Sequence, residues 1–331
     1  MIQAKTRISS PAAWQRELAQ AFTRPDELLE FLQLPAQPRA DSSFPLRVPR
    51  GYAARMIKGD PRDPLFLQVW PQSAEQIEAP GFISDAVGDL QALRDGGLIH
   101  KYRGRALVIA TGACAVHCRY CFRREFPYGE HLAARDHWSG ALKAIAADRS
   151  IEEVILSGGD PLSLADDKLA EFAQALEFLP QLRRLRIHTR QPVVLPERVD
   201  DRLCAWLSRG RLRKIMVIHA NHAQELDASV IKALNVLRET GTMLLNQSVL
   251  LRGINDSADT LVNLSESLFA AGVLPYYLHL LDRVRGTAHF EVEESRALSL
   301  MREMSARLPG YLVPKLAREH AGDPAKRVLA W

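Results

Sequence analysis

Cys114-Ala-Val-His-Cys118-Arg-Tyr-Cys121 brings three of the four cysteines of this chain into one short loop. An apolar run at 106–110 precedes the loop and predicts a buried β-strand. Thiolates spaced this closely can converge on one metal centre. Because no fourth protein ligand follows nearby, an iron–sulfur cluster bound here would keep one iron open. An open iron indicates chemistry rather than electron storage alone.

Zinc is the main alternative for the cysteine loop, since His117 lies between two of the cysteines and could also bind zinc. The loop lacks the paired two-residue spacing that is typical of zinc ribbons. The fourth cysteine, Cys204, lies in an apolar helical pattern and is predicted to be a buried core residue rather than a ligand.

The composition is that of an ordinary globular protein, with 331 residues, 47% hydrophobic and 25% charged, and a net charge of +4. Basic clusters at 183–186 and 209–214 lack interleaved aromatic residues, which argues against nucleic-acid binding. The apolar runs are far shorter than the roughly 20 residues that span a bilayer, and residues 1–11 carry no secretory signal. Clustered cysteines without an export signal predict a cytoplasmic protein.

From about residue 104, short β-branched runs alternate with amphipathic segments. This alternation predicts parallel strands joined by right-handed helical crossovers. Six units favour an α/β fold with a partial (βα)6 TIM-like barrel, and an open doubly wound sheet is the alternative. The predicted strands are 106–110, 154–157, 185–189, 215–219, 243–249 and 275–280, and the predicted helices are 132–148, 166–178, 197–208, 225–240, 257–271 and 293–307.

Three regions follow from this pattern: a mostly helical extension at 1–103, the partial barrel at 104–308, and a C-terminal segment at 309–331. The extension contains no catalytic constellation. It either covers the site or makes a homo-oligomer contact.

Polar side chains occur at the end of every predicted strand after the cysteine loop. Barrel enzymes place their active sites at the C-terminal ends of the strands, so the pattern predicts one site there. The strand-end groups are Ser157-Gly158-Gly159-Asp160, His188-Thr189-Arg190, His219-Ala-Asn-His222, Asn246-Gln247 and Asp282-Arg283.

The cysteine spacing after a first strand resembles the signature of the radical S-adenosylmethionine (SAM) superfamily. The resemblance implies that Cys114, Cys118 and Cys121 hold a [4Fe-4S] cluster whose open iron binds SAM. It also implies an external electron donor that reduces the cluster. The residues that correspond to SAM contacts are Ser157, Gly158, Gly159, Asp160, His219 and Gln247.

Longer stretches resemble a narrower group, the lysine 2,3-aminomutase family. They are Cys121-Phe-Arg123-Arg124, His219-Ala-Asn-His222, the run from Asn246 to Asp256 and the run from Pro275 to Phe290. The match is close to the short bacterial EpmB-type form, which makes (R)-β-lysine for elongation factor P. The resemblance implies 1,2-amino migration on L-lysine and a second cofactor, pyridoxal 5′-phosphate (PLP).

The same resemblance implies the residues of the PLP and substrate sites. Lys326, in Gly322-Asp-Pro-Ala-Lys326, corresponds to the Schiff-base lysine, and Lys315 is its rival within this chain. Tyr102 and Arg105 correspond to positions near PLP, and a planar guanidinium suits a phosphate. Arg123 would pair with the substrate carboxylate. Asp282 and Glu319 would hold the ε-ammonium.

The implied partners are L-lysine as a small-molecule substrate and, functionally, an elongation factor P lysyl ligase; no nucleic acid and no membrane are expected. One alternative is an aminomutase for glutamate or arginine, or a non-PLP radical enzyme. Asp282 and Glu319 disfavour glutamate, because they would repel its side-chain carboxylate. The other alternative is a non-catalytic iron–sulfur carrier or zinc module, which would require four protein ligands.

Overall fold

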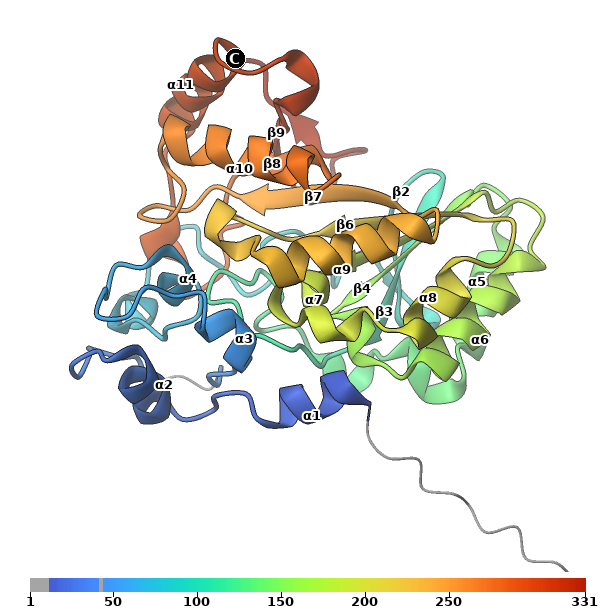
Figure 1. The fold of residues 1–331 in the computed structure, drawn as a ribbon. Helices are drawn as coiled ribbons and strands as arrows, with labels where there is room; N and C mark the ends of the chain where they lie inside the picture. The colour runs from blue at the N-terminus through green and yellow to red at the C-terminus, as the bar shows by residue number, and fades with distance from the viewer. Residues whose placement is uncertain (1–11, 42–43) are drawn as a thin grey trace, which may run out of the picture.

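A computed structural model describes residues 12–41 and 44–331 of the chain. Residues 1–11, for which the sequence predicts no secretory signal, lie outside the described residues. The described chain forms one ten-stranded sheet in which strand order follows sequence order (Figure 1). The strands are β1 Leu93–Arg94, β2 Leu98–Tyr102, β3 Arg105–Thr111, β4 Glu153–Gly158, β5 Arg184–Thr189, β6 Arg213–Ile218, β7 Met243–Val249, β8 Leu274–His279, β9 Lys315–Arg318 and β10 Arg327–Val328.

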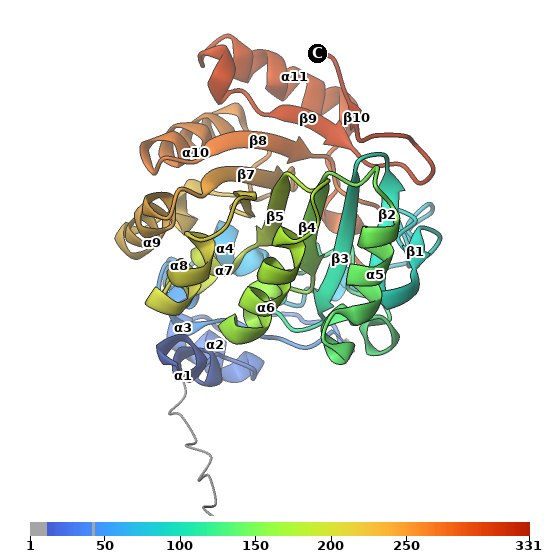
Figure 2. The same cartoon turned by 90° about the vertical axis from the view of Figure 1, so that its right-hand side faces the viewer.

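The six predicted strands correspond to β3 to β8, and each pairs in parallel with the next. The strands fan out from β2 and β3 to β9 and β10 (Figure 2). Because the order runs from β1 to β10 without closing, the sheet is open. The prediction of a partial α/β barrel is therefore confirmed.

Four strands were not predicted. β1 and β2 add an antiparallel edge before β3, within the region predicted to be mostly helical. After the last helix, β9 pairs in parallel with β8, and β10 pairs antiparallel with β9. These strands are short or carry several charged residues, so they show little of the alternation of apolar and polar residues on which strand prediction depends. They extend the sheet at both edges of the predicted barrel.

The barrel helices are α5 Ser139–Ala147, α6 Asp166–Glu177, α7 Gln191–Val194, α8 Asp201–Leu207, α9 Ala228–Glu239, α10 Ala258–Ala270 and α11 Glu294–Ser305. The short helix α7 was not predicted. The other six correspond to the six predicted helices, although α5 begins at Ser139 rather than at residue 132. α8 and α9 begin after the aspartates Asp200 and Asp227, and α10 begins after Ser257. The side chain of each caps a backbone N–H of the first turn.

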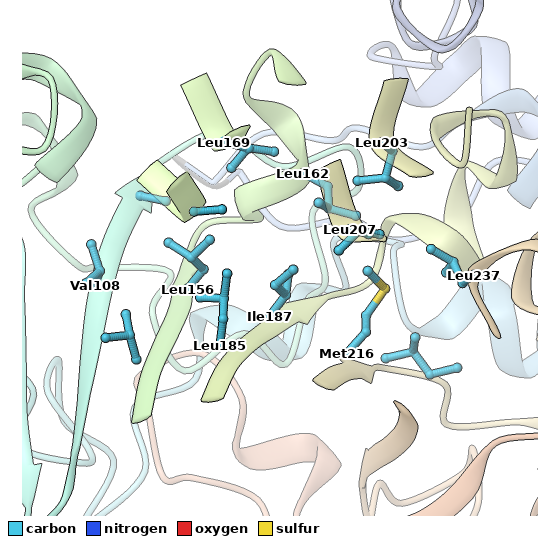
Figure 3. Packing of buried hydrophobic residues seen from close by; sticks show 14 of the residues in the cluster. Val108, Leu156, Leu162, Leu169, Leu185, Ile187, Leu203, Leu207, Met216 and Leu237 are labelled. Carbon is cyan, nitrogen blue, oxygen red and sulfur yellow. The ribbon is translucent and has the colours of Figure 1, made fainter. Parts of the chain in front are cut away.

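The main core lies between these helices and one face of the sheet. Leu156, Leu185 and Met216 from successive strands pack against helical leucines such as Leu203 and Leu237 (Figure 3). Burial of each such side chain contributes about 1.5–3 kcal/mol. Since side chains alternate along a strand, the residues between the core positions face the opposite, concave side. That side carries the strand-end polar groups.

The N-terminal extension has its own apolar core and packs on the cysteine loop. Its helices are α1 Ala13–Ala19, α2 Pro25–Leu32, α3 Arg50–Ala53 and α4 Pro64–Leu67. Pro25 is the first residue of α2, where its missing N–H costs nothing. Ala115 and Val116 of the cysteine loop belong to the same apolar cluster as α2 and α4. Of the two roles left open by the sequence, the packing supports covering the site.

Candidate functional site

A cavity of about 360 Å³ lies on the concave side of the sheet. Its wall is formed by the cysteine loop, the ends of strands β3 to β8 and the C-terminal segment. Every residue predicted to contact a metal, cofactor or substrate lines this cavity: Tyr102, Arg105, Cys114, Cys118, Cys121, Arg123, Ser157, Gly158, Gly159, Asp160, His219, Gln247, Asp282, Glu319 and Lys326. Of the predicted strand-end groups, His222, Asn246 and Arg283 are not part of its wall in the described chain. Lys315 and Cys204 are not part of the wall in the described chain.

The three loop cysteines are half-buried free thiols that face the cavity. Burial, followed by the nearby Asp160, raises the pKa of the Cys114 thiol well above its ordinary value. Burial and the neighbouring Cys118 raise the pKa of Cys121 to about 11. Within the described residues, no group of three or more His, Cys, Asp or Glu is arranged around a single ion. In a cluster each cysteine binds a different iron, so thiols that share one cavity wall fit a cluster.

The backbone of the extension holds the cysteine loop in place. The His117 N–H donates to the Arg47 carbonyl at 3.1 Å, and the Arg119 N–H donates to the Gln68 carbonyl at 2.9 Å. His117 Nδ1 lies 2.9 Å from the Pro45 carbonyl, and its ring stacks on a phenylalanine. One ring nitrogen of His117 is therefore engaged by the extension. This contact argues against His117 as a ligand through Nδ1.

Gly158 and Gly159 allow the end of β4 to lie directly against the cysteine loop. A Cβ on Gly158, whose φ is +118°, would lie 2.6 Å from the Thr111 carbonyl oxygen. A Cβ on Gly159 would lie 2.6 Å from the Ala113 carbonyl oxygen. Both contacts are with backbone, which cannot move aside as a flexible side chain can. The two glycines therefore set the distance between β4 and the cysteine loop.

Asp160 is buried and connects the ends of two strands. Its carboxylate accepts hydrogen bonds from Thr189 Oγ1 at 2.7 Å, from the Arg190 N–H at 2.7 Å and from the Leu162 N–H at 3.1 Å. The sequence predicted a SAM contact for this carboxylate. In the structure its oxygens are occupied by the protein, so its observed role is to join β4 to the end of β5.

Arg190, at the end of β5, is a site residue for which the sequence analysis proposed no role. Its Nη1 donates to Cys118 Sγ at 2.7 Å, and its Nη2 donates to Glu225 Oε2 at 2.8 Å and Gln68 Oε1 at 2.6 Å. Its position directly after a predicted strand placed it among the strand-end groups expected at the site, but gave it no specific partner. Nothing in the sequence, however, shows that Gln68 and Glu225 meet there, because they lie far apart in the chain.

A row of alternating charges crosses the cavity wall near the C-terminal segment. Arg123 donates from Nε to Asp89 at 2.6 Å, and Asp89 also lies 2.5 Å from Lys101 Nζ. Lys101 in turn lies 2.8 Å from Glu319, whose second oxygen lies 3.1 Å from Lys326 Nζ. Asp89 and Lys101 are site residues that the sequence did not predict. Lys101 lies on β2 and Asp89 in the turn before β1, in a region where the sequence predicted no strand.

The pKa values of two carboxyl groups in this region are shifted in opposite directions. Burial raises the pKa of Asp282 to about 7. Burial also disfavours charge on Glu319, but Lys326 and Lys101 outweigh it and lower the pKa of Glu319 to about 2. Glu319 is therefore a fixed negative charge. Asp282 titrates near neutral pH.

Three histidines face the cavity near Lys326: His279, which is buried, and His188 and His219, which are half-buried. Burial, followed by Arg190, lowers the pKa of His219 to about 3. Burial also lowers the pKa values of His188 and His279 well below the ordinary value, with Arg186 and Lys326 as the largest charged neighbours. The Nε2 atoms of His188 and His219 have no hydrogen-bond partner in the described chain. Buried neutral donors or acceptors without partners indicate that a bound group completes the site.

Arg105 lies on the wall formed by β2 and β3, with its guanidinium carbon 4.6 Å from the centre of the Tyr102 ring. Arg186 from β5 faces the same cavity and pairs with Glu153. Two guanidinium groups that face one cavity provide suitable donors for a phosphate.

A comparison with known proteins agrees with this geometry. The model of the radical SAM superfamily matches residues 108–264. Proteins named L-lysine 2,3-aminomutase from Escherichia coli and Haemophilus influenzae are each 47% identical over 96% of this chain, covering 94% and 95% of their own lengths. The protein of that name from Buchnera aphidicola is 42% identical over 98% of both chains.

The chain belongs to the lysine 2,3-aminomutase family. The family resemblance seen in the sequence is thereby confirmed, and so is the radical SAM type of the partial barrel. No helix in the described part of this aminomutase-family chain is long and apolar enough to cross a membrane.

Proposed function

We propose that this protein is a radical SAM, PLP-dependent aminomutase that converts L-α-lysine to (R)-β-lysine. One observation carries the proposal. The three cysteine thiols and the charged set Arg123, Asp282, Glu319 and Lys326 line the same cavity. When bound, a reduced [4Fe-4S] cluster with SAM supplies a 5′-deoxyadenosyl radical, and PLP supplies the electron-accepting group for amino migration. The relatives named L-lysine 2,3-aminomutase support the same reaction.

The cysteine loop and the strand ends fit a cluster with SAM. Cys114, Cys118 and Cys121 would bind the cluster. Because Gly158 and Gly159 have no side chains, their backbone lies close to the cysteine loop, where SAM would bind. His219 and Gln247 face the cavity from neighbouring strands, and the unpartnered Nε2 of His219 is available to a ligand.

The opposite part of the cavity fits PLP. Lys326 would bind the cofactor covalently, because its amine faces the cavity whereas Lys315 is exposed on β9. Arg105 and Tyr102 would contact the phosphate and the ring. Glu319 Oε2 lies 3.1 Å from Lys326 Nζ, so this ion pair fixes the position of the amine before the cofactor binds.

The charges of the wall fit a basic amino acid. Arg123 is held by Asp89 through Nε and by Ser157 through Nη1, which leaves Nη2 for a substrate carboxylate. Asp282 makes no side-chain ion pair within the described residues and faces the cavity, so it would receive the ε-ammonium. A glutamate side chain would instead meet the carboxylates of Asp282 and Glu319.

The finer parts of the proposal concern partners and location. An external one-electron donor would reduce the cluster, and the product would supply an elongation factor P lysyl ligase in the cytoplasm. The electron donor follows from the resemblance to the radical SAM superfamily, and the ligase follows from the resemblance to the short bacterial form of the family. The cytoplasmic location follows from the clustered cysteines.

The decisive experiment is anaerobic incubation of the reconstituted protein with L-lysine, SAM, PLP and dithionite, followed by chiral chromatography for (R)-β-lysine. Omission of SAM or of PLP should each abolish product. L-Glutamate and L-arginine serve as alternative substrates. Turnover of either one in preference to lysine would contradict the assignment. An electron paramagnetic resonance spectrum of the reduced cluster that SAM leaves unchanged would contradict the radical SAM chemistry.

A further inference from the structure

The side chain of Arg190 connects the cysteine loop to the N-terminal extension. Its Nη1 donates to Cys118 Sγ at 2.7 Å, which makes it a direct neighbour of a predicted cluster ligand. Hydrogen bonds to the sulfurs of an iron–sulfur cluster are among the factors that set its reduction potential. The donor here is also a permanent positive charge, because an arginine does not lose its proton in proteins.

The position of this guanidinium is fixed from the side opposite Cys118. Nη2 donates to Gln68 Oε1 at 2.6 Å, to Glu225 Oε2 at 2.8 Å and to the Tyr52 hydroxyl at 3.1 Å. Tyr52 and Gln68 come from the extension, whereas Glu225 follows β6. Arg190 is only 4% exposed and Glu225 is 0% exposed. The group therefore has little freedom to turn away from the sulfur.

Glu225 is itself held in place, so the ion pair is not a loose surface contact. Its Oε1 accepts from the Asn221 N–H at 2.8 Å and from Gln68 Nε2 at 3.3 Å. Arg190 Nε is buried and has no partner among the described residues. Leaving a buried N–H without an acceptor costs free energy. The unpartnered Nε therefore indicates that a group bound in the cavity supplies the acceptor.

From these contacts we propose that Arg190 is a positioning residue that makes the cluster easier to reduce. Reduction adds one electron, supplied by a low-potential one-electron donor, and no bond or proton changes at Arg190. The added negative charge spreads over the cluster and its thiolate ligands. A fixed positive charge at hydrogen-bond distance stabilises that reduced state more than the oxidised one, and the buried surroundings screen the effect only weakly. The extension contributes by holding Arg190 at Cys118.

The inference rests on the cluster of the proposed function. Its test compares the cluster of the unmodified protein with those of two variants. Arg190→Lys keeps the positive charge but loses the planar guanidinium and its several N–H donors. The double variant Arg190→Met with Glu225→Gln removes both charges without leaving an unpaired carboxylate. Arg198→Met with Asp166→Asn is the matched control. Arg198 is equally buried and pairs with Asp166 at 2.8 Å, but it does not line the cavity.

Each protein is reconstituted anaerobically with iron and sulfide, assayed for iron, and titrated potentiometrically with electron paramagnetic resonance detection. The double Arg190 variant should be at least tenfold harder to reduce than the unmodified protein, which is about 59 mV for a one-electron couple. Arg190→Lys should show a smaller shift in the same direction. The Arg198 control should keep the unmodified potential.

Several outcomes would overturn the inference. One is an unchanged potential in both Arg190 variants. Another is failure of both variants to retain iron while the Arg198 control is loaded normally, because Arg190 would then shape the loop rather than tune the cluster. Absence of a reduced-cluster signal in the unmodified protein itself would overturn the proposed function together with this inference.

Discussion

Lys326 Nζ lies 3.1 Å from Glu319 Oε2, and both residues belong to the C-terminal segment, Glu319 just after β9 and Lys326 just before β10. Lys101 holds the other oxygen of the same carboxylate at 2.8 Å. The pairing holds the amine of Lys326 at the wall of the cavity that the cysteine loop also lines. It distinguishes this lysine from Lys315, which is exposed at the start of β9.

Lys326 should be the residue that binds PLP covalently. Borohydride reduction of the PLP-loaded protein, followed by peptide mapping, should label Lys326. Lys326→Ala should lose the label and lysine turnover. Lys315→Ala is the matched control and should keep both. A label on Lys315, or a labelled Lys326→Ala variant, would contradict the assignment.

Asp282→Asn should weaken lysine binding without affecting SAM binding. The substitution removes the carboxylate charge that would face the ε-ammonium. Because a hydrogen bond to a charged group contributes about 1.5–3 kcal/mol, loss of most of this contribution should raise KM for lysine at least several-fold and at most roughly 150-fold. The perturbation of the cluster spectrum by SAM should be the same as in the unmodified protein. If SAM no longer perturbs that spectrum, Asp282 belongs to the SAM site instead.

Lysine binding should become tighter as pH rises through neutrality. The pKa of Asp282 is raised to about 7, so the carboxyl is mostly neutral below that pH and ionised above it. The substrate ammonium stays charged throughout this range, so KM should fall roughly tenfold between pH 6 and pH 8. The Asp282→Asn variant should show a flat profile. An equal slope in that variant would assign the titration to another group.

The Asp282 carboxyl should also make the folding stability of the protein depend on pH. Because the folded state keeps the Asp282 proton to a higher pH than the unfolded state does, stability should decline as pH rises from about 4 to about 7. Denaturant unfolding of the ligand-free protein across this window should show the decline. Asp282→Asn should reduce it.

Gly159→Ala should destabilise the contact between β4 and the cysteine loop. The new Cβ would lie 2.6 Å from the Ala113 carbonyl oxygen and 2.7 Å from the Gly112 carbonyl carbon, so the backbone would have to shift. Overpacking of this kind costs typically about 1–3 kcal/mol. Thermal unfolding and iron content after reconstitution would both report the change.

Gly310→Ala provides the control for this prediction. No heavy atom lies within 4 Å of a Cβ built on Gly310, and its φ is not positive. Its effect should stay within about 0.5 kcal/mol. If Gly159→Ala is equally harmless, the close approach of the two loops is not required.

The repeating part of the fold could be predicted from the sequence because its signals are local. Strands β3, β4 and β6 are mostly buried, β5 and β7 alternate between buried and more exposed residues, and the helices between the strands repeat at the spacing of one apolar face. The strands at the edges escaped prediction for the opposite reason. β1 and β10 have two residues each, and β9 includes the exposed Lys315, so hydrogen bonding to neighbouring strands defines them rather than their composition.

The sequence by itself determined the cysteine loop, the order of the strand–helix units and the polar strand ends, because each is encoded within a few adjacent residues. Only the tertiary structure decided which distant groups meet. Asp89, Lys101 and Glu319 form one row of charges only because β2 and the C-terminal segment border the same cavity. Likewise, Arg190 meets Cys118, Gln68 and Glu225 because the extension packs on the loop. Partners this far apart in the chain leave no pattern in the sequence around either one.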